Sequence, residues 1–135
     1  NAILDQILII IPNVKLSTKD VFEKYNKSDA KSGSISKIIK KILKHEKKIE
    51  VINDLEESAN RLSDGLIKKI IQECNEQGEV NTFMTGSGSG IVALMLDQQQ
   101  TKKIKEFLEN KYSNIKIICT NLKMYTCWKK KNVIV

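Results

Sequence analysis

The stretch that decides the fold is VNTFMTGSGSGIVALML, residues 80–96. Two apolar segments, Val80–Thr85 and Ile91–Leu96, flank a loop in which three glycines alternate with two serines. Glycine accepts positive φ values and lets other groups approach the backbone closely, so it suits a tight turn between strands. The pattern therefore predicts strand, glycine loop and strand in succession.

The loop is also the candidate site of the chain. Successive backbone N–H groups in such a turn can form a nest for an anion, and the serines add hydroxyl groups. No Gly-Lys-Ser or Gly-Lys-Thr follows the glycines, and a strand takes the place of the helix that a Walker A loop or a dinucleotide-binding fingerprint requires. The candidate contact residues are Thr85, Gly86, Ser87, Gly88, Ser89 and Gly90.

Further strands are predicted on both sides of this unit. Ile7–Ile11 is a continuous apolar run ended by Pro12, as expected for a buried strand. Ile115–Cys119 has the same character. After the first strand, Ser17 is placed to cap a short helix, on which we expect Phe22 to face inward.

Three longer helices are also predicted. Apolar residues at helical spacing, with lysines opposite, indicate a helix over 35–43. A second helix is expected to start at Asn53 as its cap, with Glu56 reaching back to complete a capping box, and to continue to about Gly78. Asp97 is the expected cap of a third, whose inward face carries Ile104, Phe107, Leu108 and Tyr112.

The order of these elements is strand, several helices, two strands, helix, strand. It predicts an α+β, ferredoxin-like antiparallel sheet with helices on one face and extra helices in the first crossover. We expect one domain over residues 1–122, and a tail over 123–135 that is either a closing edge strand or a solvated basic stretch.

The net charge of +7 raises the question of nucleic acid binding. Arg61 is the one arginine among 23 basic residues, although arginine is preferred for bidentate phosphate and base contacts. The strands Ile7–Ile11 and Ile115–Cys119 also lack the aromatic residues that stack bases. We therefore expect no specific nucleic acid partner.

Metal and membrane sites are not expected either. Cys74, Cys119 and Cys127 lack paired spacing and His45 is the one histidine, so we expect no metal site and interpret Cys74 and Cys119 as small core residues in a reducing compartment. The longest apolar runs are far shorter than the ~20 residues of a membrane helix. These features favour a cytoplasmic protein, with a plastid as the other possible compartment.

Three segments together resemble one enzyme family. Ile7–Pro12 with Leu16-Ser17-Thr18, then Asn53-Asp54-Leu55-Glu56, and finally Met84-Thr85-Gly86-Ser87-Gly88 are similar to motifs of the 4-diphosphocytidyl-2-C-methyl-D-erythritol kinases, a branch of the GHMP kinase superfamily. The resemblance covers residues 7 to about 122. Ser89-Gly90 stands where this family often has a Pro-Thr pair.

The resemblance implies the C-terminal domain of an ATP-dependent kinase for the 2-hydroxyl of 4-diphosphocytidyl-2-C-methyl-D-erythritol, in non-mevalonate isoprenoid precursor synthesis. It implies that ATP and Mg²⁺ are bound mainly by an N-terminal kinase domain, which also carries the catalytic residues. That domain is then a partner of this chain, which holds no catalytic residue and is inactive alone. In this interpretation Gly86, Ser87 and Gly88 contact the phosphate loop or substrate, while Thr85 and Ser89 support the turn.

Two alternatives stay open. The chain could be a stand-alone ferredoxin-like module that binds a regulatory small molecule, or the C-terminal domain of another GHMP kinase, such as a mevalonate or homoserine kinase. The chain starts at Asn1 and runs almost at once into the strand Ile7–Ile11, from which we expect it to be a piece of a longer protein.

Overall fold

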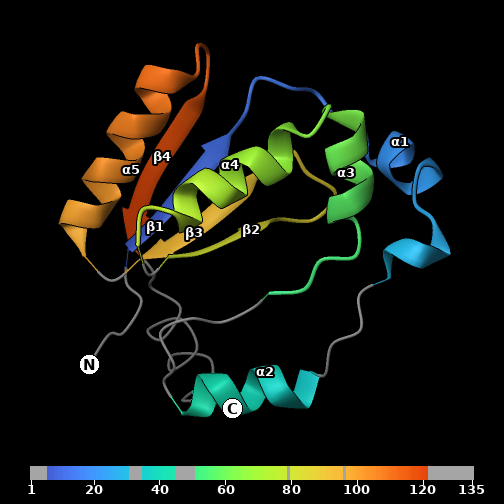
Figure 1. Ribbon diagram of the computed structural model, residues 1–135, viewed down its shortest axis with the longest axis horizontal. Coiled ribbons are helices and arrows are strands. Elements are labelled where there is room, and N and C mark those ends of the chain that lie inside the picture. Colours follow the sequence, from blue (N-terminus) through green and yellow to red (C-terminus); the bar gives the residue numbers. More distant parts are fainter. Residues whose placement is uncertain (1–5, 31–34, 45–50, 79, 96, 122–135) are drawn as a thin grey trace, which may run out of the picture.

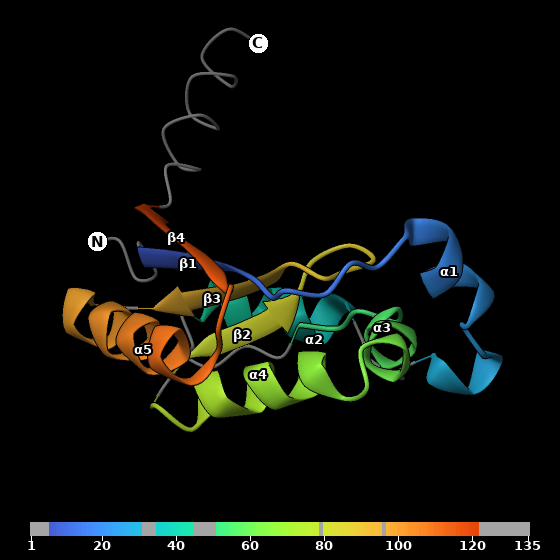
Figure 2. The same ribbon diagram turned by 90° about the horizontal axis from the view of Figure 1, so that it is seen from above.

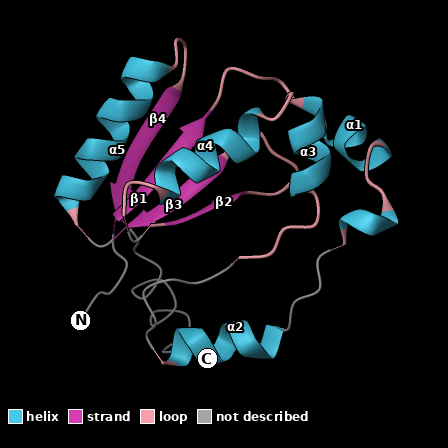
Figure 3. Ribbon diagram, in the orientation of Figure 1, coloured by secondary structure: helices cyan, strands magenta, loops and turns pink. Residues whose placement is uncertain are grey.

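A four-stranded antiparallel sheet forms the centre of the molecule (Figure 3). The computed structural model describes residues 6–30, 35–44, 51–78, 80–95 and 97–121, so the predicted tail over 123–135 lies outside the described residues. The spatial order of the strands is β2-β3-β1-β4, which confirms the predicted ferredoxin-like α+β class. The strands are β1 (Gln6–Ile11), β2 (Asn81–Met84), β3 (Ile91–Met95) and β4 (Lys116–Asn121).

The first crossover contains the extra helices that were predicted. Helix α5 (Gln98–Lys111) joins β3 to β4. Figure 2 shows α4 and α5 on the same face of the sheet, whereas α2 stands apart from it in Figure 1. None of the helices in the described ranges is both long and apolar enough to cross a lipid bilayer. Between β1 and β2 lie α1 (Thr18–Glu23), the 3₁₀ helix η1 (Lys27–Asp29), α2 (Ile35–Leu43), α3 (Glu56–Leu62) and α4 (Leu66–Asn75).

The core lies between the sheet and helices α4 and α5. Side chains alternate along β1, so that Leu8 and Ile10 are fully buried under the helices while Ile7 and Ile9 are half-buried on the opposite face. On β3, Ile91 and Ala93 are buried in the same way. The helices contribute the fully buried residues Ile67, Ile70, Cys74, Ile104 and Leu108.

The strand register determines which loops are neighbours. Ile10 of β1 pairs with Ile91 of β3 on one side and with Ile117 of β4 on the other. The C-terminal end of β1 therefore lies at the same end of the sheet as the start of β3. Because β2 pairs with β3 through Met84 and Ile91, the glycine loop closes at this end, next to the chain that leaves β1.

The helix predicted from Asn53 to Gly78 is wrong in one respect, because it is two helices. Residues 63–65 separate α3 from α4, and Asp64 and Gly65 have φ values of 53° and 83°. These left-handed conformations interrupt the backbone hydrogen bonding of an α-helix. The periodic apolar pattern continues across the break, and the pattern therefore did not reveal that the helix is interrupted.

Two side chains predicted to be in the core are on the surface. Phe22 is 58% exposed, and the buried residue of α1 is its neighbour Val21. Cys119, on the edge strand β4, is exposed, whereas Cys74 on α4 is buried as expected. On α1 the neighbouring position enters the core, whereas Cys119 is exposed because it lies on an edge strand.

An ion pair between Arg61 and the buried Asp29 attaches η1 to α3. The guanidinium of Arg61 donates to both carboxylate oxygens of Asp29, at 2.9 and 2.6 Å, and also to the carbonyl of Lys24 at 2.6 Å. The backbone N–H of Asn26 donates to the same carboxylate. Arg61, the one arginine of the chain, thus has a structural role within the fold. These hydrogen bonds, first from Arg61 and then from Asn26, lower the pKa of Asp29 to about 2.

Adjacent residues of α1 test the assignment of its buried face. We expect Val21→Ala to lower the free energy of unfolding by roughly 2 kcal/mol, because it leaves a cavity in a closed core. Phe22→Ala on the exposed face serves as the control, with an expected change within about 0.5 kcal/mol. Urea titration of both variants measures the difference. A larger loss for Phe22→Ala would show that α1 is rotated relative to the structure.

The Asp29–Arg61 pair predicts a specific acid sensitivity. The pKa of Asp29 in the folded chain lies below its ordinary value of 3.8, so its carboxylate stabilises the fold above about pH 4, and this contribution disappears as the pH falls toward 2. We expect Asp29→Asn to have a lower melting temperature than the parent chain at pH 6 and a smaller difference near pH 2. Melting curves from pH 2 to 6 would contradict the assignment if the difference did not depend on pH.

Candidate functional site

The glycine loop is a tight turn closed by backbone hydrogen bonds. At its base the N–H of Thr85 donates to the carbonyl of Gly90 at 2.9 Å, and the Thr85 hydroxyl donates to the same oxygen at 3.2 Å. Inside the loop, the N–H of Gly88 donates to the Thr85 carbonyl at 3.0 Å. Gly86 and Gly88 have φ values of 53° and 86°, which explains the need for glycine at these positions.

Gly88 lies where three separate parts of the chain approach one another. A β-carbon at this position would be 3.0 Å from Met84 Sδ, 3.2 Å from Leu16 Cδ1 and 3.5 Å from Ala59 Cβ. By contrast, a β-carbon at Gly86 would meet nothing within 4 Å. One side of the loop is therefore packed against the segment after β1 and against α3, and the other side is open.

The N-terminus of α1 reaches the loop from one side. Ser17 caps this helix as predicted, since its hydroxyl accepts from the N–H of Asp20 at 3.0 Å. The next residue, Thr18, has its hydroxyl oxygen 3.1 Å from that of Ser87. Ser17 thus has a structural role, while Thr18 makes a direct side-chain contact with the loop.

Asn53 also contacts the loop. Its side-chain amide Nδ2 donates to the carbonyls of Met84 and Gly86, both at 2.9 Å, while its Oδ1 accepts from the N–H of Leu55 at 3.0 Å. The helix cap predicted at Asn53 is therefore wrong. The cap position is Leu55, and Glu56 is the first residue of α3 and not the third, because a turn at Asp54 and Leu55 precedes the helix.

Asp97 is a helix cap that lies away from the loop. Its carboxylate accepts from the N–H of Gln100 at 2.8 Å at the start of α5, as predicted. Since β3 runs from the glycine loop to the opposite end of the sheet, Asp97 and the loop are at opposite ends. We therefore assign it a structural role.

Sequence reasoning missed the contacts that hold the loop. Leu16 was quoted only as part of a motif, Ala59 was not singled out, and Asn53 was interpreted as a helix cap. Asn53 and Thr18 do belong to the motifs quoted above, so those motifs were the available signal. Sequence spacing does not show that their side chains meet the loop, because Asn53 and Met84 are 31 positions apart.

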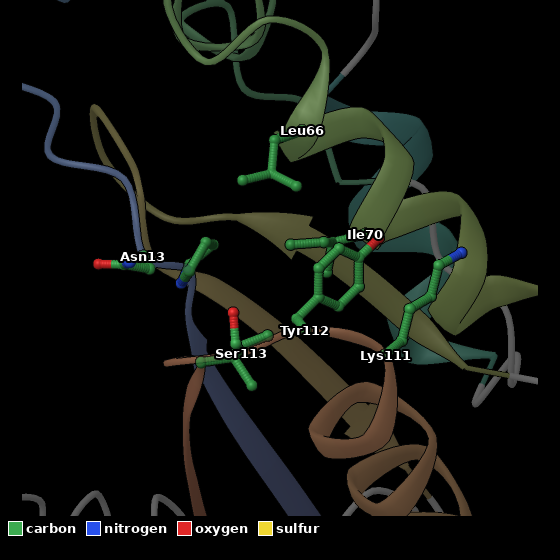
Figure 4. Close-up of a pocket in the computed structure, with 8 residues that line it drawn as sticks. Asn13, Leu66, Ile70, Lys111, Tyr112 and Ser113 are labelled. Atoms are coloured by element: carbon green, nitrogen blue, oxygen red, sulfur yellow. The ribbon is translucent and has the colours of Figure 1, made fainter.

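A recess that is separate from the glycine loop opens between α4 and the end of α5 (Figure 4). Its volume is about 280 Å³. In Figure 4 the ring of Tyr112 lies between Ser113 on one side and the Lys111 side chain on the other, and overlaps Ile70 in this view. The recess is lined by Pro12, Asn13, Leu66, Ile70, Lys111, Tyr112, Ser113 and Ile115.

Two polar groups of this recess, those of Lys111 and Tyr112, are already engaged with the protein. Lys111 Nζ and the Tyr112 hydroxyl both donate to Oε1 of the buried Glu73, at 2.9 and 2.7 Å. These bonds tie the end of α5 to α4. Burial, and then the Glu73 carboxylate, raise the pKa of the neighbouring Cys74 to about 12, so its thiol stays protonated and is no nucleophile. The recess is thus a weaker candidate than the glycine loop.

Metal binding requires several ligand side chains that lie close together. In these ranges, no group of three or more His, Cys, Asp or Glu side chains is arranged to hold a metal ion. Mg²⁺ is usually bound by carboxylates together with substrate phosphates. The described part of the chain therefore does not fit a dedicated magnesium site.

Comparison with known proteins agrees with this architecture. The family described as "GHMP kinases C terminal" matches residues 37–114. The 4-diphosphocytidyl-2-C-methyl-D-erythritol kinase of Thermoanaerobacter pseudethanolicus is 27% identical, over 88% of this chain and 43% of that protein. The chain thus spans less than half the length of this curated relative.

Two crystal structures share the fold. A 4-(cytidine 5'-diphospho)-2C-methyl-D-erythritol kinase superposes with a TM-score of 0.68 at 19% identity, over 86% of this chain and 42% of that one. Homoserine kinase from Cytophaga hutchinsonii gives 0.63 at 17% identity, over 89% and 43%. At these identities the likeness concerns the fold.

The sheet, its helical face and the glycine loop define an α+β domain of the kind found in the C-terminal halves of small-molecule kinases. The family match covers more than half of the chain. The chain belongs to the GHMP kinase C-terminal family.

The two positive-φ glycines predict different costs of substitution. Gly86→Ala places a methyl group in open space and is expected to cost about 1 kcal/mol from backbone strain alone. Gly88→Ala adds crowding against Met84 and Leu16, so we expect a loss of about 2–3 kcal/mol. Urea titration of the two variants measures the difference. Equal losses would show that the loop is not packed against the segment after β1.

Proposed function

We propose that this chain is the C-terminal domain of a kinase that transfers phosphate from ATP to the 2-hydroxyl of 4-diphosphocytidyl-2-C-methyl-D-erythritol. The observation that carries the proposal is the convergence of three segments. Of the segments that resemble this kinase family, Leu16–Thr18 and Asn53–Glu56 each contact the third, Met84–Gly88, which forms the loop. The relative of that name, aligned over most of the chain, supports the same substrate.

The loop has the properties that one wall of an interdomain cleft needs. Thr85 and Gly86 are exposed, and residues 87–90 are half-buried, so a second domain or a ligand can reach them. Within the described residues, the N–H groups of Gly86 and Ser87 donate to no protein acceptor. Such donors suit a phosphate group or the phosphate-binding loop of a second domain.

Each loop residue has a proposed part. Gly86 and Ser87 close the cleft with their backbone N–H groups, and the Ser87 hydroxyl is oriented by Thr18. Gly88, whose own N–H donates to the Thr85 carbonyl, lines the cleft by keeping the loop folded. Thr85 supports the turn through its two hydrogen bonds to the Gly90 carbonyl. Ser89 supports the same turn. ATP supplies the phosphoryl group. We assign the binding of ATP and Mg²⁺, and the catalytic residues, mainly to an N-terminal kinase domain in the cytoplasmic full-length protein.

Two other functions are compatible with this fold. Homoserine kinase shares the fold, so the main alternative is a GHMP kinase that acts on another substrate. A stand-alone regulatory module would use the recess beside Tyr112, whose cationic group is already paired with Glu73. The family match favours a kinase over such a module.

The proposal predicts a defined substrate preference. With ATP and Mg²⁺, the full-length protein should phosphorylate 4-diphosphocytidyl-2-C-methyl-D-erythritol with a kcat/KM at least about a hundredfold above those for homoserine and mevalonate. Residues 1–135 alone should show no turnover. ADP release and ³¹P NMR of the product measure both. A preference for homoserine or mevalonate would reject the substrate, and turnover by the isolated chain would reject the assignment of catalysis to another domain.

A further inference from the structure

The side chain of Asn53 forms hydrogen bonds with two parts of the structure, the glycine loop and the entrance to α3. Both donors of its amide go to the loop region, to the carbonyls of Met84 and Gly86, and its oxygen accepts from Leu55 at the entrance to α3. The residue is half-buried. A helix cap needs the acceptor alone, so the two donors toward the loop call for another explanation.

The two accepting carbonyls determine how the loop peptides are oriented. In a trans peptide the C=O of one residue and the N–H of the next point in opposite directions. The Met84 carbonyl points at Asn53, and the N–H of Thr85 accordingly points the other way, where it donates to Gly90. By the same rule, the Gly86 carbonyl on Asn53 directs the N–H of Ser87 away from α3.

We propose that Asn53 is a positioning residue that holds the Gly86–Ser87 peptide in the orientation in which the Ser87 N–H faces the reacting phosphate groups. This inference rests on the proposed function for its last step, because the phosphate belongs to that function. Asn53 makes no contact with substrate in this role. It acts through the loop, whose Ser87 N–H is the donor.

The side-chain chemistry of asparagine explains why this residue type is needed. An aspartate would keep the shape and the acceptor for Leu55 but would place a carboxylate oxygen against two carbonyl oxygens. Serine or alanine would lose at least one of the two donors. Glutamine carries the same groups one methylene further from the backbone. Only asparagine supplies two donors and one acceptor at this distance.

The test compares Asn53→Asp with a matched control, Asn60→Asp. Asn60 is a half-buried residue of α3 whose Oδ1 accepts from the N–H of Lys68 at 2.9 Å, so the same substitution there keeps the acceptor and leaves the loop untouched. Asn53→Ala is a second variant that removes the side-chain bonds without adding charge.

The first measurement needs no catalytic activity. Hydrogen exchange of the Thr85 and Gly88 amides in residues 1–135, followed by NMR, reports the bonds that close the loop. We expect both Asn53 variants to exchange about tenfold faster there, as for the loss of one or two hydrogen bonds, and Asn60→Asp to leave these amides unchanged. Unchanged exchange in the Asn53 variants would overturn the proposal, whatever the protein phosphorylates.

The second measurement uses the full-length protein. Asn53→Asp and Asn53→Ala are expected to lower kcat about 10- to 100-fold, with KM for the acceptor changed less than about threefold, because a displaced donor affects the reacting geometry more than binding. Asn60→Asp should retain the parent kcat. Faster loop exchange with an unchanged kcat would overturn the positioning role. A parent protein without kinase activity would reject the proposed function, while the exchange experiment would still decide whether Asn53 holds the loop.

Discussion

The pairing of β1 with β3 is the constraint on which the rest of the structure depends. Their antiparallel register, from Gln6 opposite Met95 to Ile10 opposite Ile91, buries alternate side chains under the helices. It also brings the end of β1 beside the glycine loop, so the chain that leaves this strand must pass it. A slip by one residue would turn Leu8 and Ile10 to the other face of the sheet and separate these segments.

The contact between α3 and the glycine loop depends on the break between α3 and α4. Helix α4 packs along the sheet, while Figure 1 shows α3 turned away from it at the end where α1 lies. The positive φ values of Asp64 and Gly65 make this change of direction, and Arg61 on α3 ties it to η1 through Asp29. As a result, Ala59 of α3 packs at Gly88 beside Leu16.

Much of the fold was predictable, because strands and amphipathic helices have local signatures. The apolar run Ile7–Ile11, the glycine loop between two strands and the cap at Asp97 all correspond to observed elements. The errors have a common physical origin. Whether Val21 or Phe22 enters the core, and whether a helical pattern is broken at Gly65, depends on partners distant in the sequence. Local propensity is weaker than these tertiary contacts.

The sequence by itself determined the α+β class, the position of the glycine loop and the motifs that relate the chain to the GHMP kinases. Those features follow from residue periodicity and from the backbone freedom of glycine, which are local properties. Only the tertiary structure decided that Asn53 holds the loop and does not cap a helix. Its amide can do either, and the choice is made by carbonyl groups that the folded sheet brings within 2.9 Å.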